Sequence, residues 1–292
     1  MAIQLAKNYV PLLDEVYQRE SVTSDLTGDP AMARAGANAK EIVYPQIAVT
    51  GLGDYDRNSG YTRGTVDLKW VTAEYNYDRG ERLSVDAMDN QETYNIAFGM
   101  AGAELMRTKV APEADAFTFA TLAGIDGISR GEDKTIADAD TFLKELLLAK
   151  NKMDNDEVPE EGRILYAIPA LLNGLMMLDT FKSKEILASF TIKKSVPQGR
   201  FYTAIDLLDG KSKDEEAGHY KKADGAKDIN FMIIHKPAII KHDKHVVSNI
   251  IPADMNPDAD ADIIKYRKYG LVDVYKNKVA GIYLSTKAAG GV

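Results

Sequence analysis

Alternating acidic and amide residues are the pattern in this chain that comes closest to a metal site. From position 254 to position 262, every second residue carries a carboxylate or amide oxygen: Asp254, Asn256, Asp258, Asp260 and Asp262. A calcium EF-hand loop begins in this way, but it needs glycine at its sixth position and a bidentate glutamate at its twelfth. Those positions hold Ala259 and Lys265. We interpret the segment as a solvated turn between two strands, with loose binding of a divalent cation as the alternative.

Three histidines within eleven residues, His235, His242 and His245, have the ring nitrogens that zinc prefers. A lysine stands directly beside each of them, which raises the cost of bringing a cation there. The chain has no HExxH pattern, and no partner carboxylate stands at helical spacing. We therefore expect a partly exposed connection of the strand–helix–strand kind.

Nucleophilic and phosphate-binding motifs are missing from the sequence. The chain has no cysteine, which excludes disulfides and thiolate chemistry, and it has four histidines but no GxSxG. The stretch Gly51-Leu52-Gly53 lacks the third glycine of a dinucleotide fingerprint, and no helix is expected after it. The sequence therefore predicts no catalytic residue, no cofactor and no metal, and we expect a protein that is not an enzyme.

The composition is that of an ordinary globular chain. Its 292 residues, 45% of them hydrophobic, can bury one large core or two smaller ones. No apolar run approaches the ~20 residues that span a bilayer, and no secretory signal opens the chain, so we expect no membrane partner. The net charge of -8 repels phosphate backbones, which argues against nucleic-acid binding as the main activity. The simplest interpretation of this charge is that it keeps the protein soluble.

Two β-rich segments joined by a glycine-rich stretch predict a long hairpin. Residues 41–50 form the first, and in residues 65–77 the apolar Val66, Leu68 and Trp70 alternate with polar residues. A two-stranded hairpin is marginal alone in water. Because this hairpin also carries aromatic residues, we expect it to pack against another chain. The alternative is a place in a larger sheet of its own domain.

The first forty residues predict an arm without a core of its own. Residues 2–20 have apolar side chains at helical spacing, interrupted at Pro11. Residues 21–40 are small and polar, with a turn signal at 27–30. We expect the arm to dock onto something through its short helix, and the alternative is a loose N-terminus.

The strongest helix signal lies between Asp89 and Ala123. Asp89 and Glu92 make a capping-box pattern, and an apolar stripe at period 3.6 follows. Pro112 is expected to kink this helix and Gly124 to end it. A continuous helix would be roughly 50 Å long at ~1.5 Å per residue, which is more than a compact domain of this size needs. A long helix next to a long hairpin suits lateral assembly.

Helices and strands are interleaved over the rest of the chain without a regular βαβ period. We therefore expect the α+β class. The charged, glycine-punctuated residues 210–228 are expected to form an exposed loop. The other elements that the periodicity predicts are helices at 137–153 and 169–178 and strands at 162–168, 230–235, 245–252 and 263–284.

Four segments, taken together, resemble the major capsid proteins of tailed bacteriophages. The opening LAKNYVPLLDEVYQRESVTSDL resembles their N-terminal arm. Residues 51–93, which begin GLGDYDRNSGYTRG, resemble their extended loop and its return strand. Residues 107–123 (RTKVAPEADAFTFATLA) resemble the second half of their spine helix, and residues 266–285 resemble the last strands of their peripheral domain.

The resemblance implies a Hong Kong 97-like phage capsid fold. It would divide the chain into an N-terminal arm (1–40), an extended β-hairpin loop (41–88), a peripheral domain with the spine helix (89–135 and 241–292) and an axial domain (136–240). The function that it implies is that of a major capsid protein, which self-assembles into pentamers and hexamers of an icosahedral head around double-stranded DNA. The arm and the hairpin would then find their partners in neighbouring subunits. The location that it implies is the virion capsid, assembled in the cytoplasm of the bacterial host.

The partners implied by the resemblance are further copies of the chain, a portal protein at one vertex and decoration proteins, with DNA enclosed without sequence-specific binding. Members with a fused scaffold carry a long helical leader before the arm, so we expect a separate scaffolding protein here. Some members join a loop lysine covalently to an asparagine of a neighbour, and Lys69 and Asn256 lie at loosely comparable places. We expect packing alone, as in most members.

The expected assembly contacts are Tyr55, Arg57, Trp70 and Arg79. We assign them to a hairpin that cannot bury them alone, and Trp, Tyr and Arg are the residue types that most often carry interface energy. Packing within the chain is the alternative. Two other functions stay open: an encapsulin-like nanocompartment, which shares the fold and encloses enzymes, and a metal-dependent enzyme that uses the acidic segment and the histidines.

Overall fold

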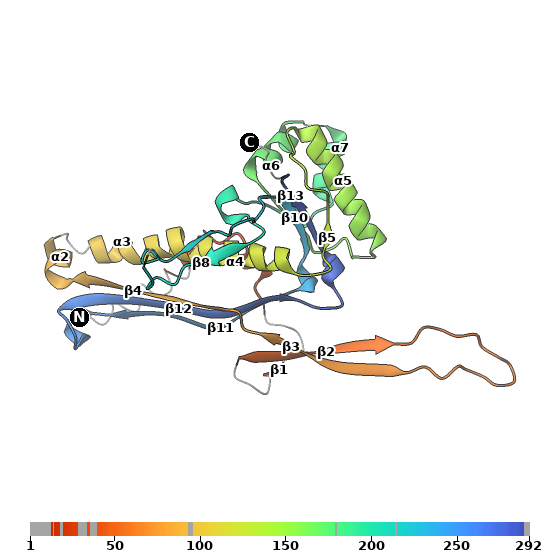
Figure 1. The fold of residues 1–292 in the computed structure, drawn as a ribbon, viewed down its shortest axis with the longest axis horizontal. Helices are drawn as coiled ribbons and strands as arrows, with labels where there is room; N and C mark the ends of the chain where they lie inside the picture. The colour runs from red at the N-terminus through yellow and green to blue at the C-terminus, as the bar shows by residue number, and fades with distance from the viewer. Residues whose placement is uncertain are drawn as a thin grey trace.

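The computed structural model describes residues 13, 15–17, 20–28, 34–35, 40–92, 96–178, 180–213 and 215–288. Helices and strands are interleaved along these residues, so the predicted α+β class is confirmed. The molecule has a long, flat part, a rounded part that rises from one side of it, and a hairpin that projects beyond both (Figure 1). No helix in these described ranges is long and apolar enough to cross a membrane.

A long helix runs along the flat part (Figure 1). Its pieces, with the short helix before it, are α2 (Ala87–Glu92), α3 (Ile96–Leu105), a π-helical turn (Met106–Val110) and α4 (Ala111–Gly124). The predicted end at Gly124 is confirmed. Pro112 stands in the first turn of α4, directly after the π-helical turn. The departure from α-helical geometry therefore precedes Pro112, whose ring nitrogen cannot bond the carbonyl four residues back.

The start of this helical stretch differs from the prediction of a cap at Asp89. Helix α2 already begins at Ala87, and the carboxylate of Asp86 accepts the backbone N–H of Met88 at 2.9 Å. Asp89 lies in the first turn instead, where a negative charge is stabilised by the positive end of the helix dipole.

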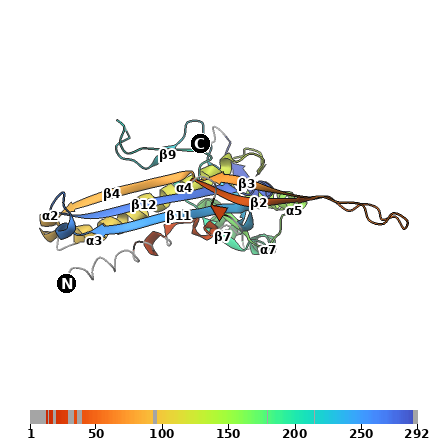
Figure 2. The same cartoon turned by 90° about the horizontal axis from the view of Figure 1, so that it is seen from below.

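An antiparallel sheet lies along the long helix (Figure 2). Its strands, in the spatial order β11-β12-β4, are β4 (Tyr77–Asp86), β11 (Ile239–Ile251) and β12 (Ala261–Val274). Met106 of the helix and Tyr266 of β12 pack together in a buried cluster with Leu13 of the arm. Gly102 permits this close packing, because a Cβ there would lie 3.0 Å from a methyl carbon of Leu13.

The rounded part is built on a five-stranded sheet. Its strands, in spatial order, are β5 (Ser129–Arg130), β13 (Ile282–Thr286), β10 (Ile229–His235), β6 (Arg163–Ala167) and β7 (Ile192–Ser195). Strands β6 and β10 are buried along their whole length, as their apolar sequences predict. The predicted strands over 263–284 divide between the two sheets, since β12 belongs to the first and β13 to this one.

Helices cover both faces of this five-stranded sheet. The helices α5 (Ala139–Asn155), α6 (Pro169–Met177) and α7 (Phe181–Ala188) lie together in the rounded part (Figure 1). Phe142 and Leu146 of α5 pack on Phe231 of β10 in one buried cluster. On the other side, Phe119 and Leu122 of α4 pack on the sheet in a second cluster. The end of the long helix is therefore part of the core of the rounded part.

Two smaller sheets complete the fold. The first has the order β1 (Arg34–Ala35), β2 (Glu41–Val49), β3 (Val66–Glu74), and its strands β2 and β3 form the long hairpin. The second consists of β8 (Ile205–Leu207) and β9 (Tyr220–Lys222). The predicted long hairpin is thus confirmed, and the predicted loop at 210–228 contains one short strand. The domain limits expected from the sequence stay a prediction.

Candidate interaction surfaces

The register of the β2–β3 hairpin gathers apolar side chains on one of its faces. Residues directly opposite in an antiparallel pair share a face, as does every second residue along a strand. The opposed pairs on this face are Pro45–Trp70, Ile47–Leu68 and Val49–Val66. The exposed fractions of the large side chains among them are Ile47 60%, Val49 71%, Val66 74%, Leu68 51% and Trp70 49%. We call these six residues the apolar face of the hairpin.

The opposite face of the same hairpin is polar. Gln46 is opposed by Lys69, and Ala48 is opposed by Asp67. Lys69 Nζ lies 3.1 Å from the Asp67 carboxylate, and both side chains are largely exposed. Contiguous exposed apolar surface beside a polar one is typical of an interaction site. The two faces therefore indicate which side of the hairpin another molecule covers.

The root of the hairpin is fixed on the body of the chain. Ile42, Tyr44 and Ala73 are buried against Ile240 and Leu271. Beyond this root the hairpin projects away from the body in both views (Figures 1 and 2). The body therefore fixes the base of the hairpin, and the outer half of the hairpin is exposed to solvent.

The tip of the hairpin holds two of the residues that the sequence singles out. Tyr55 packs edge-on against Tyr61, with ring centroids 4.9 Å apart. The Asp56 carboxylate accepts the backbone N–H of Asn58 at 2.6 Å, which closes the turn and lowers the pKa of Asp56. Arg57 is exposed and forms no ion pair with any residue that the structure describes. Its guanidinium is therefore available to a second molecule.

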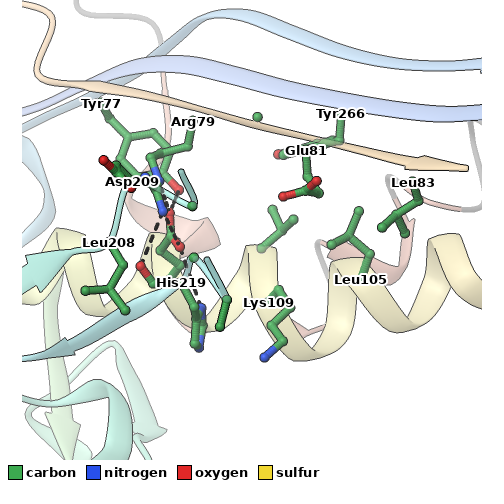
Figure 3. A pocket seen from close by; sticks show the side chains of 16 residues that line it. Tyr77, Arg79, Glu81, Leu83, Leu105, Lys109, Leu208, Asp209, His219 and Tyr266 are labelled. Carbon is green, nitrogen blue, oxygen red and sulfur yellow. Dashed lines mark hydrogen bonds and ion pairs between the residues drawn. The ribbon is translucent and has the colours of Figure 1, made fainter. Parts of the chain in front are cut away.

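Arg79 lies on the body and not in the hairpin. It stands in β4, where its Nε donates to a carboxylate oxygen of Glu113 in α4 at 2.7 Å (Figure 3). Its Nη2 donates to the carbonyl oxygen of His219 at 3.3 Å. Burial alone would raise the pKa of Glu113, but the neighbouring imidazole and guanidinium outweigh it and lower that pKa. We expected Arg79 at an assembly contact because we assigned it to the hairpin, and that assignment is wrong. Its role as an assembly contact stays a prediction.

A cavity of about 320 Å³ adjoins this ion pair. It lies between β4, the long helix and the loop before β9 (Figure 3). Leu83 and Leu105 are among its apolar lining residues, and Asp209 brings a carboxylate. Hydrogen bonds from Ser212 and from the backbone of the same turn lower the pKa of Asp209 to about 2. The charge of Asp209 therefore serves to hold its own loop.

Asp115 is a residue whose role sequence reasoning missed. It is fully buried in α4, and its carboxylate accepts the N–H groups of Val22 and Thr23 at 2.9 and 3.0 Å. The hydroxyls of Ser21 and Thr23 donate to it at 2.9 and 2.6 Å. Arg200 Nη1 donates to it at 3.1 Å. The one available signal in the sequence is an aspartate among alanine and phenylalanine in a predicted helix.

Two buried lysines of the flat part hold the same arm. Lys241 of β11 donates through Nζ to the hydroxyl of Thr23 at 2.6 Å and to its carbonyl at 3.0 Å. Lys268 of β12 donates to the Tyr17 hydroxyl at 2.7 Å and lies 2.9 Å from the Asp243 carboxylate. Burial lowers the pKa of Lys241 to about 8. The described part of the arm therefore packs on its own chain, which corrects the expectation that it lacks partners there, and its contacts with neighbouring subunits stay a prediction.

The alternating acidic segment is a turn between β11 and β12, as predicted. The Asp262 carboxylate accepts the N–H of Ala253 at 2.8 Å and the side-chain amide of Asn90 at 2.9 Å. The Asn256 side chain donates to the carbonyl of Ala261 at 2.9 Å. These two residues therefore hold the turn together. The other acids of the segment are exposed: Asp254, Asp258 and Asp260.

The three histidines lie along one connection of the predicted strand–helix–strand kind. His235 ends β10, a 3₁₀ turn (Lys236–Ala238) follows, and His242 and His245 stand in β11. Burial is the main cause that lowers the pKa of His235. Within the described part of the chain, no three His, Cys, Asp or Glu side chains gather into a set that could hold a metal ion.

No protein-family model matches the chain, and no curated protein does. Solved structures match its fold over most of its length. The capsid of cyanophage P-SCSP1u is 13% identical, with a TM-score of 0.57 over 87% of this chain and 85% of that chain. The mature capsid of bacteriophage PhiM1 is 11% identical, with a TM-score of 0.55 over 86% and 83%. A virus-like particle from Pyrococcus furiosus is 10% identical, with a TM-score of 0.58 over 96% and 99%. At such low identity the likeness shows the fold, and it confirms the predicted architecture.

Proposed function

We propose that this chain, which has the Hong Kong 97-like fold of phage capsids, is the major capsid protein of a tailed bacteriophage. As a shell subunit it assembles into pentamers and hexamers of an icosahedral head. The observation that carries the proposal is the apolar face, which is exposed on a hairpin that projects from the body. Fully burying one Val, Leu or Ile side chain contributes roughly 1.5–3 kcal/mol. Covering the whole face therefore contributes favourably to association, against the entropic cost of bringing two molecules together.

A second copy of the chain fits as the partner because the molecule has unlike ends. The hairpin projects from one end, and α2 lies at the other (Figures 1 and 2). A backbone hydrogen bond from Ala87 of α2 to Asp260 ties the acidic turn to that far end. The far end exposes the side chains of Met88 and Met255. Contacts between unlike surfaces run head to tail, and they form rings when the rotation closes.

Two exposed arginines at the tip of the hairpin can pair with the acidic turn at the far end of the next copy. Arg57 and Arg63 are exposed at the tip together with Asp54 and Asp56, and the Asp56 carboxylate is bonded within its own turn. The segment 252–264 has acidic residues and no basic one. Complementary charges steer two surfaces together and fix their register more than they add affinity. We propose that the hairpin of one subunit lies over the far end of its neighbour.

Packing without a covalent cross-link is part of the proposal. Lys69 lies on the polar face of the hairpin in an ion pair with Asp67. The amide of Asn256 donates to a carbonyl inside its own turn. Each group therefore has a bonding partner within its own chain. A single band near the mass of one chain, on a denaturing gel of mature particles, supports packing alone, and a ladder of multiples contradicts it.

The enclosed molecule in this proposal is double-stranded DNA, held without recognition of its sequence. The net charge of -8 supports a wall that does not bind phosphate groups. The other partners are a separate scaffolding protein, a portal protein at one vertex and decoration proteins. The particle forms in the cytoplasm of the bacterial host, and the subunit performs no catalysis.

A nanocompartment shell of the encapsulin kind is the second candidate. The match to the virus-like particle from Pyrococcus furiosus, which covers 96% of this chain and 99% of that chain, supports it. The two candidates differ in what the shell encloses. Particles isolated from producing cells contain DNA in the first case and folded protein cargo in the second.

Electron microscopy of the purified chain, alone and together with its scaffolding protein, tests the proposal. Closed shells or rings are the expected result. A compact monomer under both conditions, with activity that depends on a metal, would overturn the shell and favour an enzyme.

A further inference from the structure

Residues 20–26 of the arm, which we call the strap, contact three parts of the body at once. Asp115 belongs to the long helix, and Lys241 belongs to β11 of the flat part. Lys194 of β7 and Arg200, which follows β7, belong to the rounded part. All four side chains bond the strap or the residues that hold it. A short segment with these contacts is placed to keep the three parts in one arrangement.

The rounded part holds the strap through two cations. Lys194 Nζ lies 2.6 Å from the Asp25 carboxylate and donates to the carbonyl of Val22 at 3.0 Å. Arg200 Nη1 donates to the carbonyl of Glu20 at 3.0 Å. The same guanidinium reaches Asp115, so it connects the rounded part to the long helix as well.

The flat part holds the strap through Thr23. The Thr23 hydroxyl and N–H donate to Asp115, and its hydroxyl and carbonyl oxygens accept from Lys241. Thr23 and Asp115 are 0% exposed and Lys241 is 3% exposed, so water does not replace these bonds easily. Just after the strap, the backbone N–H of Gly28 donates to the carbonyl oxygen of Lys241 at 3.0 Å.

The apolar end of the strap enters the core at the same junction. Leu26 packs in a buried cluster with Ile164 of β6 and Val272 of β12. This cluster already joins the rounded part to the flat part, and the polar bonds of the strap stand around it. Loss of the strap would therefore remove an apolar contact and leave buried charges without their hydrogen bonds.

We propose that the strap locks the rounded part onto the flat part of the subunit, and that its release loosens the angle between them. Asp115 is a positioning residue in this lock, because it compensates the buried cations and binds the strap at once. The lock is a property of a single copy and does not depend on what the particle encloses.

Pulsed electron paramagnetic resonance on the full chain tests the lock, since the absence of native cysteine allows labels at chosen sites. Leu148→Cys on α5 and Val246→Cys on β11 label exposed positions of the two parts. A second pair, Thr27→Cys with Val246→Cys, reports on the position of the strap, because Thr27 directly follows it in the chain. We expect narrow distance distributions for both pairs in the otherwise unchanged chain.

Two substitutions release the strap in this experiment. Thr23→Val removes the hydroxyl between Asp115 and Lys241 with little change of shape, and Asp115→Asn removes the buried charge. Each should broaden both distance distributions. Ser24→Ala is the matched control, because the Ser24 hydroxyl donates to the carbonyl of Ser21 inside the strap, and both distributions should stay narrow.

Two outcomes would overturn the lock. In the first, the distance distribution of the pair with Thr27→Cys broadens while that between α5 and β11 stays narrow. The strap would then not hold the two parts together. In the second, the strap label stays in place in both variants, so the polar anchors do not hold it. If Asp115→Asn fails to fold, as seen by circular dichroism, Thr23→Val carries the test. Either outcome leaves the shell proposal standing, because that depends on the hairpin.

Discussion

The hydroxyl of Thr23 lies between a buried anion and a buried cation. It donates to the Asp115 carboxylate at 2.6 Å and accepts from Lys241 Nζ at 2.6 Å, although Thr23 and Asp115 stand 92 positions apart in the sequence. Hydrogen bonds to charged groups are stronger than neutral ones, and leaving such groups unbonded inside a protein is costly. This arrangement explains how an arm with few large apolar residues still docks.

Replacing Asp115 should destabilise the folded chain severely. Asp115→Ala leaves the Arg200 guanidinium, the Thr23 hydroxyl and two backbone N–H groups without their acceptor. Removing one partner of a buried ion pair typically costs about 3–5 kcal/mol, and we expect a loss of unfolding free energy of that order. Denaturation in guanidinium chloride measures it.

The matched control for Asp115→Ala lies on the same long helix. Glu104 pairs with Arg107 on the exposed side, with Nη2 of the arginine 2.8 Å from the carboxylate. Glu104→Gln should leave the denaturation midpoint nearly unchanged, because exposed ion pairs contribute little. Equal effects of the two substitutions would show that burial of Asp115 is irrelevant.

The buried Lys241 should make stability depend on pH above neutrality. Its pKa in the folded chain is about 8, below the ordinary value of 10.5, because burial disfavours the charged form. Below pH 8 both states are protonated and the cost is constant. Between about 8 and 10.5 the unfolded chain holds the proton that the folded chain has released, so stability rises with pH, by up to about 3 kcal/mol.

Comparison with Lys241→Met isolates the contribution of Lys241 to the pH dependence of stability from that of the tyrosines, which titrate in the same range. The unfolding free energies of the two proteins, measured from pH 7 to pH 10.5, should differ by an amount that changes in favour of the unsubstituted chain as pH rises. A difference that stays constant over the range would mean that Lys241 is not perturbed.

The two faces of the hairpin should respond differently to the same substitution. Ile47→Ser on the apolar face should change the unfolding free energy by less than about 0.5 kcal/mol, because Ile47 is 60% exposed. It should raise the protein concentration needed for assembly by about tenfold or more, since burying one isoleucine contributes ~1.5–3 kcal/mol. Gln46→Ser, one residue away on the polar face, should assemble normally. Light scattering during assembly compares them.

Charge reversal tests the proposed contact between the tip and the far end. Arg57→Asp with Arg63→Asp should lower particle yield, and so should Asp254→Arg with Asp258→Arg. All four changes in one chain place the two new aspartates of the tip opposite the two new arginines of the far end, so the yield should recover in part. Lys213→Asp with Lys221→Asp is the control with the same change of net charge as the tip pair. If the particle yield of the fourfold variant does not recover, the tip and the far end are not in contact with each other.

The expected contact residues divide into two kinds. Arg57→Ala should lower particle yield while the unfolding free energy stays nearly constant, because Arg57 is exposed. Trp70→Ala should lower particle yield more than it lowers the unfolding free energy, because Trp70 is half exposed. Arg79→Ala should lower the unfolding free energy, since it breaks a largely buried ion pair with Glu113. Normal yield for the first two variants would remove them from the interface.

The sequence by itself determined most elements of this protein. The buried strand β10, the α6 helix that begins at Pro169 and the paired strands of the hairpin all follow from periods and turn signals within a few residues of one another. The exposed turn of the acidic segment follows in the same way. Such patterns are local, because the geometry of helices and strands relates near neighbours.

Only the tertiary structure decided which of these elements meet. It brought Thr23 to Asp115, placed Arg79 on Glu113 instead of on the hairpin, and put β13 in the sheet of β10. It also set the register that opposes Ile47 to Leu68 and so collects the apolar side chains on one face. These relations join residues that are distant in sequence, and a contact between distant residues depends on how every segment between them packs.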